Sequence, residues 1–450
     1  ILIFLVVALA QIYVIHQTNT PTYDSYFTLR QIDSISQTGF PLSYDQLSYQ
    51  GRTQAGGGLF YYLMFLFSLF IPAIILCKYA GVVLLLISLF LVYLISKRLF
   101  PTKRIALFTL LLASSSTVLL TTYSNSLVPQ TLFAICFLSL IYVFIRFEQE
   151  EKFSWWFIFL IVISTFISSL SLLFIFAFIV YALLLKLESF SLKKKEFEVF
   201  IVTGLFIIWF HLLMFKKVLF GKGTSLLWQT IPQELTQVYF RDLSLPLAIS
   251  FAGLLPLILG LIGLYISLFE ERHRKLVFLS SFVLIFGLFL WFGFLPFQEG
   301  LFFFVLTITI LSGLFLSKIV SFFRKTNLSL IKNVLTIFLC ILILASFLSI
   351  FSFSSTISNQ SPLNEDISLL LDLKNISFSD ETILANVYEG HFVAFTTKNK
   401  VLIDENFLLA PNVQERYDDM EKIFLTKSEL ELKRLLETYS INYIYESKNS

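Results

Sequence analysis

A succession of long apolar runs constrains the fold of this chain more than any other feature. The runs lie near residues 1–16, 58–77, 79–96, 104–122, 127–145, 153–170, 171–185, 198–215, 244–269, 276–296, 300–317 and 331–353. A helix that crosses a bilayer needs about 20 apolar residues, and most of these runs approach that length. Hydrophobic residues make up 57% of the chain and charged residues 14%, a composition that excludes a soluble globular domain. The sequence therefore predicts a polytopic α-helical membrane protein with about 11 to 13 transmembrane helices, embedded in the lipid bilayer.

The remaining composition excludes several other classes of protein. The net charge of +3 is segregated along the chain, and no stretch resembles a patch that binds nucleic acid. Cys77, Cys136 and Cys340 are widely spaced within apolar runs, which argues against disulfides and against a zinc site. The sequence contains no phosphate loop, dinucleotide-binding fingerprint, nucleophile elbow or HExxH motif.

The first apolar run, residues 1–15, is short for a membrane span. It is either the core of a signal peptide or a truncated first transmembrane helix. No cleavage site of small residues precedes the polar loop around Asp24, so the truncated helix is favoured.

The basic residues predict the topology, because short basic loops face the cytoplasm. The basic clusters are Lys97-Arg98 with Lys103-Arg104, Lys193-Lys194-Lys195, Arg272-His273-Arg274-Lys275, and Arg324-Lys325 with Lys332. All of them fall on one side if segment 58–77 does not cross the membrane, and its three glycines at 56–58 and Pro72 favour a re-entrant or interfacial helix. Loops 17–57 and 217–243 and the chain after 354 then share the opposite, extracytoplasmic side.

The composition changes at residue 354, which divides the chain into a transmembrane domain, 1–353, and a soluble domain, 354–450. Segments 382–388, 400–404 and 441–445 have the apolar character of short strands. Segment 428–439 has leucines at helical spacing. These elements predict a small C-terminal α/β extracytoplasmic domain.

The motifs of loop 17–57 resemble a known family. They are Asp24-Ser-Tyr-Phe-Thr-Leu-Arg30, Gly39-Phe40, Tyr44-Asp45, Gly51-Arg52 and Gly56-Gly57-Gly58. In order and spacing they resemble the first external loop of the catalytic subunit of oligosaccharyltransferase, a GT-C membrane glycosyltransferase. Two later segments resemble the same family in position, Ile231-Pro-Gln-Glu234 and Ala385-Asn-Val-Tyr-Glu-Gly-His391 with Lys400-Val-Leu-Ile-Asp404.

The chain also departs from that family at three places. The second acidic motif would fall at Ser124-Asn125-Ser126, where both carboxylates are absent. The Trp-Trp-Asp that reads an acceptor sequon would fall at Asn386-Val387-Tyr388, and the membrane arginine has no counterpart around Glu299-Gly300. The resemblance therefore supports the fold more strongly than transfer to an asparagine sequon.

The resemblance implies a set of site residues. Asp24 and Glu234 correspond to catalytic carboxylates, and their oxygens suit a divalent cation, Mg²⁺ or Mn²⁺. Because two carboxylates alone bind such a metal weakly, a metal-independent mechanism is the alternative. The residues implied in substrate binding are Arg30, Asp45, Arg52, Tyr388, Gly390 and His391. Local reasoning offers alternatives for three of them. Arg30 could pair with Asp33 at i,i+3 on a helix, and Arg52 could simply pin the loop. A lone histidine such as His391 is more often an ordinary surface or satisfied residue.

The resemblance also implies a function. A GT-C enzyme at the plasma membrane transfers a sugar or oligosaccharide from a polyprenyl (dolichyl-type) phosphate or diphosphate carrier to an extracytoplasmic acceptor, a protein or a glycan. The alternative is a catalytically degenerate relative that binds a lipid-linked glycan or a partner without transfer. A transporter or flippase is less favoured, because few ionisable residues lie within the spans and no inverted repeat is visible.

Overall fold

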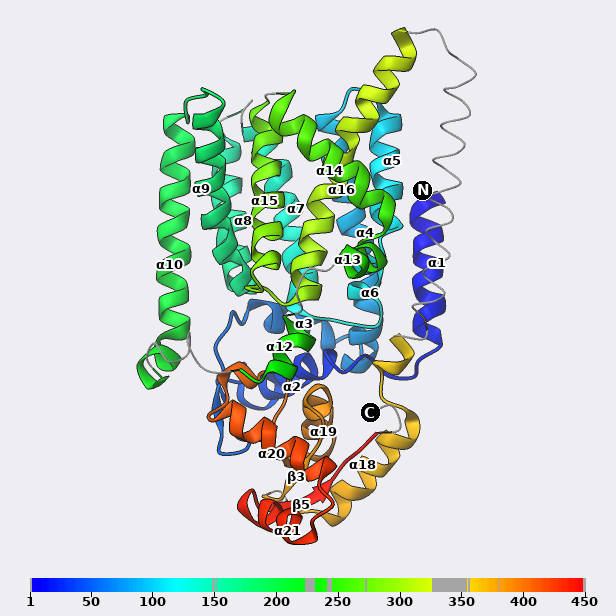
Figure 1. Cartoon of the computed structure of the whole chain (residues 1–450), viewed down its shortest axis with the longest axis vertical. Coiled ribbons are helices and arrows are strands. Elements are labelled where there is room, and N and C mark those ends of the chain that lie inside the picture. The colour runs from blue at the N-terminus through cyan, green and yellow to red at the C-terminus, as the bar shows by residue number, and fades with distance from the viewer. Residues whose placement is uncertain are drawn as a thin grey trace.

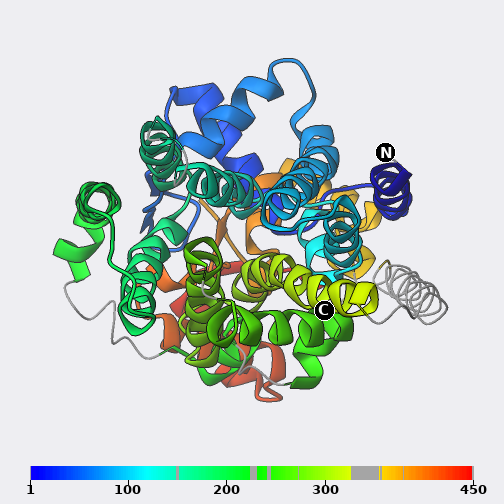
Figure 2. The ribbon, with the colours of Figure 1, turned by 90° about the horizontal axis from the view of Figure 1, so that it is seen from above.

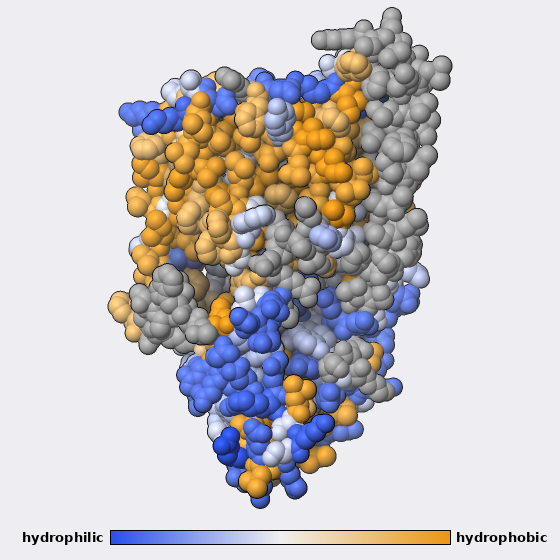
Figure 3. Space-filling model, in the orientation of Figure 1, coloured by the Kyte–Doolittle hydropathy of each residue, from blue (hydrophilic) through white to orange (hydrophobic). Residues whose placement is uncertain are grey.

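The protein consists of a bundle of apolar helices with a polar domain at one end (Figure 1). In this computed structural model the described residues are 2–147, 150, 152–222, 231–240, 245–271, 273–325, 354, 357–378 and 380–447. Figure 3 shows a broad hydrophobic band across the visible face of the bundle, bordered by hydrophilic residues at both ends. This distribution is what a bilayer selects, because lipid solvates apolar side chains and excludes polar ones.

The bundle is built from helices that fit the apolar runs of the sequence. Its elements are α1 (Leu2–His16), α4 (Ala73–Leu99), α5 (Lys103–Ser114), α6 (Thr117–Tyr123), α7 (Pro129–Phe147), α8 (Phe153–Ile167), η1 (Ser169–Ser171), α9 (Leu172–Leu187), α10 (Lys194–Lys222), α13 (Leu245–Ala252), α14 (Leu254–Phe269), α15 (Arg274–Trp291) and α16 (Phe297–Lys325). Seen from above in Figure 2, α1 and α10 lie at the periphery.

Fewer helices reach the length of a full span than the sequence predicts. In the described part of the chain six helices are long and apolar enough, or seven if α5 and α6, which meet at a 63° bend, form one span. Four shorter apolar helices, α1, α3, α8 and α14, account for other predicted segments. The predicted span at 331–353 and Cys340 lie outside the described residues.

Aromatic side chains form close contacts between several helices of the bundle. Phe144 stacks on Phe278 with ring centroids 3.6 Å apart, and Phe178 stacks on Phe200 at 4.3 Å. These rings join α7, α9, α10 and α15. Because phenylalanine offers a large apolar face without a polar group to satisfy, the 53 phenylalanines of the chain suit close helix packing in lipid.

Three segments that are far apart in the sequence meet at the polar end of the bundle (Figure 1). The first is the loop after α1, with α2 (Ser25–Thr38), β1 (Tyr44–Asp45), β2 (Arg52–Thr53) and α3 (Leu59–Ser68). The second is α12 (Gln233–Tyr239), and the third is the C-terminal domain. Helix α3 has only 10 residues and is too short to cross a bilayer.

The C-terminal domain contains a three-stranded parallel sheet in the order β4-β3-β5. Its elements are α18 (Asn364–Ile376), β3 (Thr382–Leu384), η2 (Val387–Glu389), α19 (Gly390–Thr397), β4 (Lys400–Val401), η3 (Phe407–Leu409), α20 (Val413–Leu425), α21 (Glu429–Thr438) and β5 (Ile441–Ile444). The strands and α21 confirm the α/β character predicted from the sequence, with shorter strands than expected. Helices α18, α19 and α20 are additions to that prediction.

The N-terminal loop contributes an edge to this sheet. Ser48 forms a parallel bridge with Val401, and backbone hydrogen bonds run from Tyr49 N to Val401 O (2.9 Å) and from Val401 N to Leu47 O (2.8 Å). Helix α12 docks on the same domain through Leu235, which is buried in the domain's core. Loop, helix and domain therefore form one connected unit against the membrane helices.

Candidate functional site

Asp24 lies at the N-terminus of α2, where the chain enters the space between bundle and soluble domain. Its carboxylate makes no capping hydrogen bond to the helix that it begins, and its side chain is solvent-accessible. The positive end of the α2 dipole favours a negative charge at this point. Asp24 is therefore available for interactions with other groups.

Hydrogen bonds fix the loop that carries Asp24 onto residues 123–127 of the bundle. Thr22 N donates to Asn125 O (3.0 Å), Thr28 Oγ1 donates to Leu127 O (2.8 Å), and Leu127 N donates to Ser25 Oγ (3.1 Å). Residues 123–127 pack closely against α4. A Cβ added at Gly81 of α4 would lie 2.1 Å from the carbonyl oxygen of Tyr123, so only a glycine permits this approach. The position of Asp24 is therefore set by three segments that pack on one another: its own loop, residues 123–127 and α4.

Two other acids lie within electrostatic range of Asp24. Glu405 follows β4 in the C-terminal domain, and Glu299 is in the first turn of α16. The hydroxyl of Tyr239, at the end of α12, donates a hydrogen bond to Glu405 Oε1 (3.4 Å). The negative charge of Asp24 acts on the same phenol. Glu299 accepts a hydrogen bond from Gln130 Nε2 (2.5 Å) at the start of α7. Five elements of the chain therefore send polar side chains toward one place.

The protonation of these acids is shifted by their surroundings. Protein atoms crowd around Asp24 although water reaches it, and this burial raises the pKa of its carboxyl group. Burial also raises the pKa of Glu405, and the negative charges of Asp24 and Asp404 raise it further. Carboxyl groups that repel one another in a low-dielectric setting hold protons at higher pH than free ones. Perturbed acids of this kind mark candidate sites for proton transfer.

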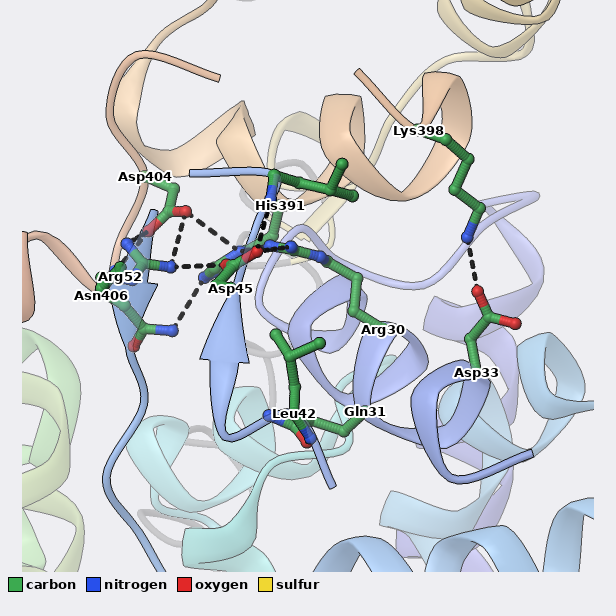
Figure 4. Close-up of polar contacts among 11 residues, drawn as sticks. Arg30, Gln31, Asp33, Leu42, Asp45, Arg52, His391, Lys398, Asp404 and Asn406 are labelled. Atoms are coloured by element: carbon green, nitrogen blue, oxygen red, sulfur yellow. Dashed lines mark hydrogen bonds and ion pairs between the residues drawn. The ribbon is translucent and has the colours of Figure 1, made fainter. Parts of the chain in front are cut away.

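A buried network of ion pairs joins loop 17–57 to the C-terminal domain (Figure 4). Asp45 accepts from Arg30 Nη2 (2.5 Å) and from Arg52 Nη2 (3.0 Å). Arg52 also binds Asp404 in a bidentate pair, at 2.5 and 2.9 Å. The two arginines and two aspartates balance in charge, and their side chains are at most 4% exposed.

His391 completes the network as a neutral ring. Its Nδ1 lies 3.1 Å from Arg30 Nη1, and its Nε2 lies 3.2 Å from Asn406 Nδ2. Burial lowers the pKa of His391 to about 4, and the charge of Arg30 opposes protonation further. Burial alone would raise the pKa of Asp404, but the charge of Arg52 outweighs it and holds that pKa well below the usual range.

The network shows which partners several of the predicted site residues have. Arg30 pairs with Asp45 and not with Asp33, so the local i,i+3 alternative is wrong. Asp33 instead binds Lys398 at 2.5 Å. Arg30, Asp45, Arg52 and His391 are all buried, so the structure gives them a direct role in holding the loop on the domain. Their contact with a substrate stays a prediction.

Gly390 and Tyr388 differ from one another in their surroundings. A Cβ at Gly390 would lie 2.6 Å from Asp404 Cβ and 2.7 Å from Ile403 O, so this glycine permits the close approach of α19 to residues 403–404. Tyr388 is 36% exposed, and its ring meets the edge of Tyr23 at 5.6 Å, beside Asp24 in the sequence. Of the two, Tyr388 offers an accessible surface.

Glu234 lies in the first turn of α12 and is exposed. Its charge acts on Tyr417 of α20. The structure brings Glu405 and Glu299 to Asp24, and the pairing of Asp24 with Glu234 stays a prediction. Ser124 and Ser126, which stand where acids were expected, are buried in the turn that supports the Asp24 loop.

Known proteins share this architecture. The structure of the oligosaccharyltransferase of Archaeoglobus fulgidus tethered to an acceptor peptide with an NVT sequon matches with a TM-score of 0.71 and 12% identity, over 98% of this chain and 68% of that chain. The same enzyme in complex with Zn and sulfate matches with a TM-score of 0.66 and 13% identity, over 98% and 67%. ArnT from Cupriavidus metallidurans bound to undecaprenyl phosphate matches with a TM-score of 0.57 and 10% identity, over 93% and 87%.

The chain has the GT-C glycosyltransferase fold. In agreement, the family model described as dolichyl-phosphate-mannose-protein mannosyltransferase matches residues 58–214, from the start of α3 into α10. No curated protein sequence matches the chain. The GT-C fold and its membrane helices identify an integral membrane protein.

The acids in the described part of the chain do not form a recognisable metal site. Within the described ranges no group of three or more histidine, cysteine, aspartate or glutamate side chains converges closely enough to hold a metal ion. Mg²⁺ and Mn²⁺ rely on carboxylate oxygens, and the turn at 124–126 supplies serines in their place. The described residues alone therefore supply no complete ligand set for Mg²⁺ or Mn²⁺, the cation stays a prediction, and the chemistry proposed below does not depend on one.

The sequence prediction missed three acidic groups of the site. Asp404 belonged to a segment noted for its resemblance, and Glu405 directly follows it, which was the one available signal. Glu299 was noted only for the missing arginine beside it. Asp404 lies near Arg52, and Glu405 and Glu299 lie near Asp24, solely because elements that are distant in the sequence pack together.

Proposed function

We propose that this protein transfers a sugar from a polyprenyl phosphate or diphosphate to an acceptor on the extracytoplasmic side of the plasma membrane, with Asp24 as general base. The observation that carries the proposal is the accessible Asp24 carboxylate, with its raised pKa, fixed where bundle and soluble domain meet. A general base works best when its pKa lies closer to neutrality than that of a free aspartate. The GT-C fold supports the donor class, since ArnT is known bound to undecaprenyl phosphate.

The reaction balances with one proton transfer. An acceptor hydroxyl attacks the anomeric carbon, its oxygen forms the new glycosidic bond, and its proton passes to Asp24. The bond between that carbon and the phosphate oxygen breaks, and the electron pair leaves with the polyprenyl phosphate or diphosphate. Glu405, which holds its proton to higher pH beside Asp24, adds a second carboxyl group that can orient the acceptor.

The leaving phosphate needs positive charge nearby. The charges of Arg30 and Arg52 are compensated by Asp45 and Asp404 within the buried network, so the two arginines serve the site by holding loop 17–57 in place. Lys216 and Lys217 are exposed near the lower end of α10, at the same end of the bundle as the C-terminal domain (Figure 1). We assign them to the attraction of the anionic carrier.

The acceptor differs from an asparagine sequon in this proposal. The segment Asn386-Val387-Tyr388 lacks the tryptophans and aspartate that read a sequon in the family it resembles. Tyr388 presents an accessible ring there instead, and rings of this kind stack on sugar faces as well as on peptides. A glycan or lipid-linked hydroxyl fits such a surface.

One observation favours a second function, in which the protein binds a lipid-linked glycan or a partner without transfer. Among the described residues no group of acids could hold a metal ion, and Ser124 and Ser126 stand where the family that the chain resembles has two carboxylates. A donor could then bind at the α10 end of the site and persist unreacted.

The test compares Asp24→Asn with wild type, using a panel of radiolabelled polyprenyl-phosphate and polyprenyl-diphosphate sugars and purified protein in nanodiscs. Removal of the base should lower the transfer rate on the order of 10²–10⁴-fold while donor binding persists. Asp33→Asn is the matched control, because Asp33 lies on the same helix but pairs with Lys398 at the surface. Equal transfer by wild type and Asp24→Asn would refute the catalytic assignment, and binding without transfer by wild type would establish the second function.

A further inference from the structure

A cavity lies at the other end of the bundle from Asp24. It has a volume of about 520 Å³ and is formed where the end of α4, the connection from α9 to α10, the start of α15 and the last third of α16 come together. Ligand cavities of small molecules span about 300–1,000 Å³, so this space can hold a group of several atoms. Nothing in the proposed sugar transfer uses it.

The polar lining of the cavity is predominantly basic. Arg98 from α4 and Arg274 and Lys275 from α15 contribute three cationic side chains, and Glu271 contributes one carboxylate. That carboxylate is already engaged, since Lys318 Nζ lies 3.4 Å from its Oε1. Arg274 is held in position by Glu196 at 2.5 Å, an acid that does not line the cavity. Among the residues that line the cavity, these three cationic side chains outnumber the single carboxylate, an arrangement that favours an anion.

The other part of the lining is apolar. Phe100, Phe190, Leu276 and Leu314 form this part, and Leu276 and Leu314 belong to the buried core of the bundle. The cavity thus joins a cationic rim to an apolar wall. In Figure 3 the upper end of the molecule shows the hydrophilic border directly above the hydrophobic band, which is the depth of a lipid headgroup.

We propose that this cavity binds the phosphate headgroup of an anionic phospholipid from the leaflet on the basic side of the membrane. Both halves of the lining are needed for such a ligand, because the phosphate meets Arg98 and Lys275 while the adjoining glycerol and acyl carbons contact the apolar wall. A free phosphate ion would use only the cationic half. Basic pockets between transmembrane helices on the cytoplasmic side recognise lipid headgroups by this combination.

The site has a structural consequence. It joins α4, α15 and α16, and α4 and α16 extend to the opposite end, where α16 carries Glu299 beside the Asp24 site. A bound lipid would fix the ends of these helices relative to each other. The proposal does not depend on sugar transfer and would hold equally for a protein that only binds its donor.

The test is a titration of the purified full-length chain with phosphatidylglycerol or phosphatidylcholine, with bound lipids counted by native mass spectrometry. The double variant Arg98→Gln/Lys275→Gln removes two cavity charges. Each basic side chain near an anionic headgroup contributes about a fivefold factor, so binding of the first phosphatidylglycerol should weaken about thirtyfold. The control Lys103→Gln/Arg104→Gln removes two exposed charges from the same end that do not line the cavity, and it should leave that first binding event unchanged.

Three results would overturn the proposal. Equal weakening by both double variants would mean diffuse attraction to the surface. Equal binding of phosphatidylcholine would mean that the charge of the headgroup is not recognised. Displacement of phosphatidylglycerol by millimolar inorganic phosphate would identify a site for a soluble anion. Thermal unfolding without added lipid, measured for each variant, shows whether a loss of binding reflects a loss of folding.

Discussion

Replacement of Glu389 by glutamine should change how the stability of the protein depends on pH. Glu389 ends η2, is fully buried and faces the N-terminal loop. Its charged neighbours are Asp366 and Glu446, both acidic, and the Tyr23, Tyr388 and Tyr445 phenols lie near its carboxyl group. Burial and these negative charges raise the pKa of Glu389 from 4.5 to about 7.

The sign follows from proton binding. The folded protein holds the Glu389 proton more tightly than the unfolded chain does, so stability falls as pH rises between about 4.5 and 7 and levels off above that range. One pKa unit corresponds to about 1.4 kcal/mol, and the full effect is therefore about 3 kcal/mol at pH 8. Glutamine has the shape of the protonated acid and carries no charge, so Glu389→Gln should match wild type at pH 4.5 and exceed it at pH 8.

Thermal unfolding in nanodiscs from pH 4.5 to 8.5 measures this difference. If the whole chain unfolds together, about 3 kcal/mol corresponds to a rise in Tm of about 3 °C at pH 8, and the rise is larger if the C-terminal domain unfolds alone. Glu437→Gln, an exposed change in α21, is the control and should give a profile parallel to wild type. A Glu389→Gln profile parallel to wild type would refute the reasoning, and a lower Tm at pH 8 would mean that a cation stabilises the ionised acid.

Three further predictions follow from the contacts around the site. Asp404→Asn removes one of the two carboxylate charges that pair with the buried Arg52, and it should lower the free energy of unfolding by about 3–5 kcal/mol in a denaturation assay. The control is Asp380→Asn, at a side chain that is 92% exposed beside Lys400, and it should change that free energy by less than about 1 kcal/mol. Gly390→Ala should destabilise the C-terminal domain by about 1–3 kcal/mol, measured by thermal unfolding, because its Cβ would overlap Asp404; an unchanged Tm would show that residues 403–404 move away freely. Single cysteines at Ser43 and Ser428 should react with a membrane-impermeant thiol reagent from the same side, and one at Lys97 from the other; labelling of Ser43 and Ser428 from opposite sides would disprove the topology argument.

Hydropathy and motif order were sufficient to predict the class of fold, because apolar runs of span length have few alternatives in a membrane protein. The same reasoning failed for Arg30, since i,i+3 spacing describes only neighbours on one helix and the actual partner, Asp45, lies beyond the end of α2. Glu299 and Glu405 were missed for a related reason. Their approach to Asp24 depends on how α16 and the C-terminal domain pack, which no local pattern records.

The strand pairing of Ser48 with Val401 sets an order of events during synthesis. Residues 47–49 leave the ribosome about 350 residues before their partner, a delay on the order of 20–70 s at ordinary rates of translation. Throughout that interval the loop has an open hydrogen-bonding edge, while the helices of the bundle are still being inserted. Glu405 and the partners of Arg52 reach the Asp24 loop only when the last part of the chain arrives, so a prematurely terminated chain lacks the complete site.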